Sequence, residues 1–112
     1  MKVLAIDVGG TAIKSAIVHA DGTIEDFREL ATPPVIAEGI LEAAKGYSDY
    51  AAVGICTAGL VDYKKGIVIF SSAALGYHDN EPLAEEIGSV VGVPVVVEND
   101  VNAAAMGEMT YG

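Results

Sequence analysis

The stretch KVLAIDVGGTAIKSAIVHADGTI, residues 2–24, decides the fold class of this chain. Two apolar runs flank a pair of glycines, and Asp21-Gly22 then supplies the residue types of a hairpin turn. This pattern predicts three consecutive strands that pair in antiparallel fashion, the first of them buried on both faces. The expected strands cover residues 2–8, 12–19 and 23–30.

Helical and strand patterns alternate in the rest of the chain. The expected elements are helices at 35–45 and 83–91, strands at 51–56 and 94–98, a hairpin at 60–70 and a last helix from residue 99 onward. The strand at 94–98 is apolar up to Val97, which is typical of a sheet interior. The order β-β-β-α-β-α-β-α indicates an α/β domain with a mixed five-stranded sheet, because strands separated by helices pair in parallel.

The composition limits the function classes open to this chain. Its 112 residues and 52% hydrophobic content suit one folded domain. A net charge of −10, from 6 basic and 16 acidic residues, argues against binding to nucleic acid or to an anionic membrane surface. No apolar run reaches the roughly 18 residues of a membrane span, and no export signal is visible. Cys56 is the only cysteine, so no internal disulfide is possible and we expect a cytoplasmic protein.

The motif DVGGT, residues 7–11, lies between two predicted strands. This position excludes the P-loop and the dinucleotide-binding fingerprint, because each of those motifs opens a helix. In a strand-to-strand turn, Gly9 and Gly10 let backbone N–H groups approach an anion, and Thr11 adds a hydroxyl. Asp7 is suited to hold Mg²⁺ directly or through water, and Lys14 is the nearby cation. The alternative is a simple Gly-Gly hairpin turn with a solvated aspartate.

Two further stretches place polar residues just after a predicted strand. In ENDVNAAAMGE, residues 98–108, Asp100 is suited to accept a proton from a substrate hydroxyl, and Asn99 to hydrogen-bond a neighbouring hydroxyl. Simple N-capping of the following helix is the alternative. In GICTAGLVD, residues 54–62, Gly59 allows close approach to the backbone, with an ordinary turn as the alternative.

Three stretches together, AIDVGGTAIKSAIVHADGTI, GICTAGLVDYKKGIV and VVVENDVNAAAMGE, resemble the N-terminal domain of the ROK family of sugar kinases and regulators. The resemblance spans nearly the whole chain and is closest to the branch that includes β-glucoside kinases. It implies an RNase H-like domain of the actin-like ATPase and hexokinase superfamily, with helices on both faces of the sheet. It also implies transfer of the γ-phosphate of Mg-ATP to a sugar hydroxyl, a transferase reaction of carbohydrate metabolism.

The resemblance further implies roles for individual residues. The nucleotide phosphates would be bound by Gly9, Gly10, Thr11 and Lys14, and the metal by Asp7. Asp100 falls on the family's catalytic base, Asn99 on its sugar-hydroxyl ligand and Gly59 on the turn that lines its sugar pocket. Two departures concern the sugar pocket, because Ala58 stands where many members have proline and an asparagine that many members have near Ala73 is missing.

The domain organisation follows from the same resemblance. Residues 1–112 would form the small N-terminal lobe of a two-lobe enzyme. The family's second lobe carries a zinc site, the adenosine pocket and much of the dimer interface, so we expect a homodimer at full length and no activity from this lobe alone. A sugar-sensing domain of a ROK-type regulator and a non-catalytic sugar-binding module are the alternatives. The first strand begins at Lys2 with no DNA-binding segment ahead of it, which favours the kinase.

Overall fold

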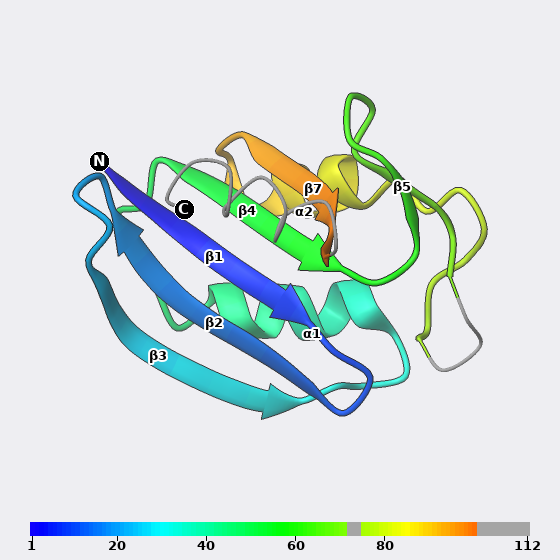
Figure 1. Cartoon of the computed structure of the whole chain (residues 1–112), viewed down its shortest axis with the longest axis horizontal. Coiled ribbons are helices and arrows are strands. Elements are labelled where there is room, and N and C mark those ends of the chain that lie inside the picture. Colours follow the sequence, from blue (N-terminus) through cyan, green and yellow to red (C-terminus); the bar gives the residue numbers. More distant parts are fainter. Residues whose placement is uncertain (72–74, 101–112) are drawn as a thin grey trace.

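The first three strands form an antiparallel meander, as the sequence predicts. The computed structural model describes residues 1–71 and 75–100, and Figure 1 shows their arrangement. The strands are β1 (Lys2–Val8), β2 (Ala12–His19) and β3 (Ile24–Ala31). Gly22, between β2 and β3, has φ +89°, which lies in the left-handed region that this Asp-Gly turn requires.

The parallel part of the sheet follows. The remaining elements are α1 (Ile36–Ala44), β4 (Ala52–Thr57), β5 (Leu60–Asp62), β6 (Ile67–Phe70), α2 (Leu83–Val91) and β7 (Val95–Asn99). β4 pairs in parallel with β1, and β7 pairs in parallel with β4, so the strand order is β3-β2-β1-β4-β7. β5 and β6 form a separate two-stranded hairpin. The mixed five-stranded sheet and the hairpin are therefore confirmed.

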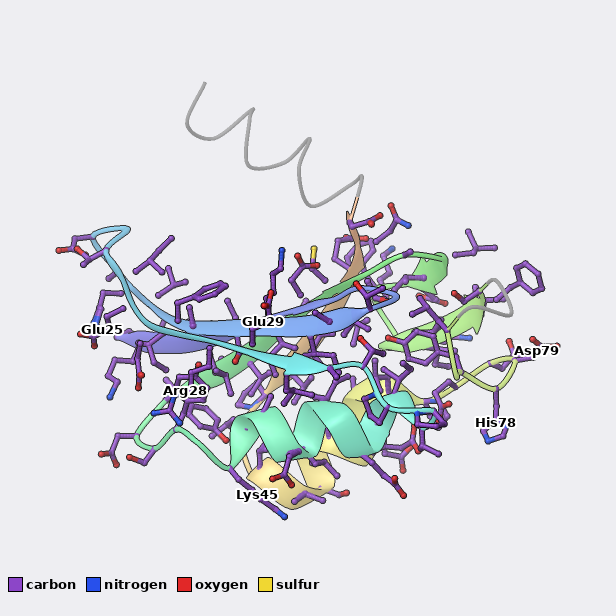
Figure 2. The ribbon with its side chains drawn as sticks, turned by 90° about the horizontal axis from the view of Figure 1, so that it is seen from below. Glu25, Arg28, Glu29, Lys45, His78 and Asp79 are labelled. Atoms are coloured by element: carbon purple, nitrogen blue, oxygen red, sulfur yellow. The ribbon has the colours of Figure 1, made fainter. Side chains whose placement is uncertain are left out.

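The hydrophobic core lies between the sheet and the two described helices. Figure 2 shows α1 and α2 on the same side of the sheet. Each helix presents an apolar stripe to the sheet, and the largest helical side chains in the core, all fully buried, are Ile36, Ile40, Leu83 and Ile87. Neither described helix, at nine residues, has the length to cross a bilayer.

Two expectations about burial were wrong. β1 is not buried on both faces by the described residues: Leu4, Ile6 and Val8 face the core, whereas Asp7 is exposed on the opposite face. Both described helices pack on one side, so β1 alternates between buried and accessible residues. β7 lies at the edge of the sheet and not in its interior, since each crossover adds its strand outside the previous one, and Val96 is 54% exposed. The predicted last helix lies almost entirely outside the described residues.

Candidate active site

The carboxyl ends of three parallel strands meet at one edge of the sheet. The register aligns Val8 of β1 with Thr57 of β4, and Thr57 with Asn99 of β7. A polar or glycine residue lies within two positions after the end of each strand, so the DVGGT turn, the turn after β4 and the Asn99-Asp100 pair converge. In open α/β sheets, ligands bind at this edge, beyond the carboxyl ends of the strands.

One residue earlier on each strand, polar side chains form a row across the face that the two helices leave open. The register aligns Lys14 with Asp7, Asp7 with Cys56, and Cys56 with Glu98. These four residues and Asp100 line a concavity of about 690 Å³. Burial raises the pKa of the Cys56 thiol, and the negative charges of the three surrounding carboxylates raise it further. The thiol therefore stays protonated at neutral pH and packs as an apolar group.

The DVGGT turn is closed by its own first glycine. The Gly9 N–H donates a 2.9 Å hydrogen bond to the carbonyl oxygen of Ala12. A side chain at Gly9 would place its Cβ 2.9 Å from that same oxygen, so this glycine is needed for the turn itself. At Gly10, by contrast, nothing lies within 4 Å of where a Cβ would be. The second glycine thus leaves open space beside the backbone, where a ligand could approach.

Thr32, which follows β3, fixes the far side of this turn. Its hydroxyl donates to the Gly9 carbonyl at 2.7 Å and its N–H donates to the Thr11 carbonyl at 3.0 Å. The carbonyl oxygens of Gly9 and Thr11 therefore accept their hydrogen bonds from Thr32. Within the described part of the chain, the N–H groups of Gly10 and Thr11 have no hydrogen-bond acceptor, and both residues are exposed. Two adjacent backbone donors of this kind suit an anionic ligand.

The turn after β4 is tied to the end of β7. The side-chain amide of Asn99 donates a hydrogen bond to the Gly59 carbonyl. Gly59 has φ +115°, and a Cβ there would lie 2.7 Å from the carbonyl oxygen of Phe70 on β6. Only glycine fits this position, because both the backbone angle and the space exclude a side chain. Asn99 and Gly59, predicted separately from sequence, therefore contact each other.

The carboxylate next to the DVGGT turn suits a metal site that is completed by a phosphate ligand. In the described ranges, 1–71 and 75–100, no group of three or more His, Cys, Asp or Glu side chains is arranged to hold a metal. Asp7 is an exposed carboxylate two residues before the Gly9-Gly10 pair, and the space beside Gly10 is open. Mg²⁺ commonly binds through one or two carboxylates, water and substrate phosphates, and does not need an all-protein cage. The donor set therefore fits Mg²⁺ held with a phosphate ligand.

The family follows from comparison with known proteins. The model of the ROK family matches residues 3–112, almost the whole chain. The chain belongs to the ROK family. The family resemblance read from the three sequence stretches is thus confirmed.

The ROK relatives of this chain include a glucokinase and a β-glucoside kinase. It is 37% identical to a glucokinase of Streptomyces coelicolor over 97% of its own length and 36% of the relative's. It is 30% identical to a β-glucoside kinase of Listeria monocytogenes, covering 100% of this chain and 39% of that relative. The chain thus spans little more than a third of the curated relatives it matches.

A solved ROK structure has the same fold. The chain superposes on a ROK family glucokinase from Streptomyces griseus, in complex with glucose and AMPPNP, with a TM-score of 0.87 and 40% identity. The match covers all of this chain and 37% of the glucokinase. The expected actin-like ATPase fold is therefore confirmed.

The structure brings most of the candidate residues to one edge of the sheet. Those that line the concavity are Asp7, Lys14 and Asp100, those in the flanking turns are Gly9, Gly10, Thr11 and Gly59, and Asn99 is the last residue of β7. Sequence reasoning missed the supporting residues Thr32, Glu98 and Tyr77. Glu98 had a local signal, its place beside Asn99-Asp100. Thr32 and Tyr77 act through contacts distant in sequence, which no local pattern reveals. The position near Ala73 lies outside the described residues.

Proposed function

We propose that this ROK chain is the N-terminal lobe of an ATP-dependent sugar kinase, which transfers the γ-phosphate of ATP to a sugar hydroxyl. One observation carries the proposal. A turn with two unpartnered N–H donors and a strand end with an amide and a carboxylate, Asn99 and Asp100, lie at the same edge of one sheet. The first suits a phosphate and the second a hydroxyl-bearing substrate, in a chain whose relatives include glucokinases.

The phosphate end of the site is assigned to the DVGGT turn. The N–H groups of Gly10 and Thr11 would bind phosphate oxygens, while Gly9 holds the turn in shape. Lys14 would add one positive charge from β2, and Asp7 would hold Mg²⁺. Bound Mg²⁺ supplies charge neutralisation on the phosphate oxygens. A chain with 6 basic residues and a net charge of −10 has few side-chain cations to bind phosphate, which is why backbone donors and a metal are needed.

The sugar end of the site is assigned to the strand ends of β4 and β7. Asn99 and the Gly59 turn would hold the sugar hydroxyls, and Asp100 would act as the general base. The sugar oxygen forms a bond to the γ-phosphorus, the bond from that phosphorus to ADP breaks, and the hydroxyl proton passes to the Asp100 carboxylate. Positioning and charge stabilisation provide most of the acceleration in such transfers.

The rest of the enzyme would come from a second lobe. The chain spans little more than a third of its curated relatives, which supports a two-lobe protein of which residues 1–112 form the first part. We propose that the second lobe supplies the adenosine pocket, the zinc site and the dimer interface. The lobe on its own would then lack catalytic activity, and measurable ATP turnover by purified residues 1–112 would contradict this.

ADP release is the experiment that tests the function. The protein carrying both lobes is supplied with Mg-ATP and, in turn, with glucose, fructose, N-acetylmannosamine and phosphorylated β-glucosides. Sugar-dependent ADP release identifies a kinase and its substrate class. A folded protein that binds a sugar but releases no ADP contradicts the kinase and supports the sugar-sensing alternative. One that binds no sugar contradicts both.

A further inference from the structure

A tyrosine in the loop between β6 and α2 reaches back to the carboxyl end of β4. The Tyr77 hydroxyl donates a 3.0 Å hydrogen bond to Oγ1 of Thr57. Burial raises the pKa of Tyr77 to about 12, so its hydroxyl keeps its proton at neutral pH. Thr57 is itself fully buried, and its hydroxyl donates to the Ala58 carbonyl at 3.2 Å. A partly buried chain of hydrogen bonds therefore runs from the loop into the turn after β4.

The same turn is the one that Asn99 contacts. Thr57 is aligned with Asn99 in the register of β4 and β7. Two residues after Thr57, the Gly59 carbonyl accepts the hydrogen bond of the Asn99 amide. The turn is thus held from two sides, by Tyr77 through Thr57 and by Asn99 directly. Loss of the first contact would therefore be expected to shift the turn that Asn99 meets.

The loop that carries Tyr77 has its own anchors. Leu75 is buried, and Gly76 packs so closely on the Pro34 carbonyl that a Cβ would lie 1.6 Å from its oxygen. On the other side, the His78 N–H donates to the Glu81 carboxylate at 3.0 Å. Figure 2 shows the side chains of His78 and Asp79 pointing away from the sheet. Among the described residues of this anchored loop, Tyr77 donates a side-chain hydrogen bond to the end of β4.

We infer that Tyr77 is a positioning residue for the sugar site, which it serves by holding Thr57 and the Gly59 turn in the place where Asn99 meets them. The inference rests on the proposed function. Tyr77 itself contacts Thr57 and not the sugar. Its influence is specific to the sugar end, because the phosphate end depends on a separate set of bonds from Thr32 to Gly9 and Thr11.

The test is sugar affinity in the protein carrying both lobes, measured by calorimetry with the sugars of the panel above. Tyr77→Phe keeps the ring and removes the hydroxyl. We expect it to weaken sugar binding about three- to tenfold, the effect of about one neutral hydrogen bond, with the KM for ATP unchanged. Tyr63→Phe makes the same chemical change on a tyrosine that is 56% exposed in the β5–β6 hairpin, and should leave both affinities unchanged.

Variants at Thr57 test the same link from its other partner. Thr57→Val removes the hydroxyl at similar volume and should weaken sugar binding like Tyr77→Phe, while Thr57→Ser retains the hydroxyl and should bind as the wild type does. Thr57→Val removes the acceptor of the Tyr77 hydroxyl as well as the donor to the Ala58 carbonyl, so the double variant Tyr77→Phe/Thr57→Val should be no weaker than Thr57→Val alone. If Tyr77→Phe fails to fold, the difference in sugar affinity between Thr57→Val and Thr57→Ser tests the inference instead.

The possible results separate this inference from the proposed function. Wild-type sugar affinity in Tyr77→Phe overturns the inference, as does equal weakening of sugar and ATP, which would mean a general loosening of the fold. A wild type that binds sugar but does not phosphorylate it contradicts the kinase, and the affinity comparison still tests Tyr77. A wild type that binds none of the sugars overturns both.

Discussion

The side-chain amide of Asn99 donates a hydrogen bond to the carbonyl oxygen of Gly59, a residue 40 positions earlier in the chain. This contact joins the end of β7 to the turn after β4, and it depends on a backbone shape that only glycine adopts there. Gly59 has φ +115°, with no room for a Cβ beside Phe70. The sugar end of the proposed site is therefore built on a turn that requires glycine.

Replacing that glycine should cost stability and sugar affinity together. Gly59→Ala places a Cβ against the Phe70 carbonyl in a disfavoured backbone region, so we expect a loss of about 1–3 kcal/mol in the free energy of unfolding. Urea denaturation measures the loss, and calorimetry measures the accompanying drop in sugar affinity. Gly88→Ala is the control. Gly88 lies within α2, and a Cβ there would make an ordinary van der Waals contact with Val95 at 3.7 Å. That variant should be as stable as the wild type, or more so by up to about 1 kcal/mol. Equal stability of the two variants would contradict the need for glycine at position 59.

Removing the proposed base should stop the reaction without unfolding the protein. Asp100 is exposed, so Asp100→Asn removes a charge and little packing. Since general-base catalysis contributes roughly 10²–10⁴-fold, we expect kcat to fall by about that factor with the KM for the sugar nearly unchanged. The matched control is Asp49→Asn, an exposed aspartate before β4 with φ +62°, a conformation that asparagine also adopts. Wild-type turnover in Asp100→Asn would remove this residue from the mechanism.

Local patterns sufficed to predict the elements of this fold. The bounds of β1 and β2 follow directly from apolar runs on either side of a turn, and α2 ends at residue 91, as its apolar pattern predicts, with Gly92 at φ +73° after it. The place of β7 was mispredicted. An all-apolar run indicates a strand with little solvent contact, but its rank in the sheet depends on where the crossovers return the chain, which composition does not encode.

The residues proposed to contact ligands could be predicted from the sequence, whereas the residues that hold them in place could not. Gly9, Asp7 and Asp100 stand directly after or within strand patterns, where residue type alone suggests chemistry. Thr32 and Tyr77 contribute through hydrogen bonds to residues 20 or more positions away. Such partners are fixed only once the sheet has formed, so no spacing in the sequence identifies them. The contact between Asn99 and Gly59 has the same origin.

Thr32 should hold the phosphate end of the proposed site in place, as Tyr77 is proposed to do for the sugar end. Thr32→Val removes the hydroxyl that bonds to the Gly9 carbonyl at 2.7 Å. We expect a loss of about 1 kcal/mol in the free energy of unfolding and about a fivefold rise in the KM for ATP, with sugar affinity unchanged. Thr32→Ser should restore both.

Thr23→Val is the control for the loss of a threonine hydroxyl in a turn. Thr23 lies in the hairpin between β2 and β3, where its N–H donates to Asp21 at 2.9 Å, away from the carboxyl ends of the parallel strands. It should leave the KM for ATP unchanged. If Thr32→Val also leaves this constant unchanged, the DVGGT turn does not need its threonine support.

A pair of glutamates at the start of α2 should make stability depend on pH. A hydrogen bond between the Glu81 and Glu86 carboxyls, which requires a proton on one of them, raises the pKa of Glu86 to about 7, with burial and neighbouring charges adding to it. The native state therefore holds a proton that the unfolded chain releases near pH 4.5. The stability from this proton is complete below about pH 4.5 and is lost as the pH rises to about 7.

Glu86→Gln should remove this pH dependence. The glutamine amide donates to Glu81 at every pH, so the variant should match the wild type at low pH and exceed it by about 1–2 kcal/mol above pH 7, after allowance for solvent screening. Urea denaturation at intervals from pH 4.5 to 8 measures the difference. Glu38→Gln, an exposed glutamate in the first turn of α1, is the control and should shift stability by a small amount that varies little with pH. Parallel pH profiles for the wild type and Glu86→Gln would mean that the native protein does not hold this proton.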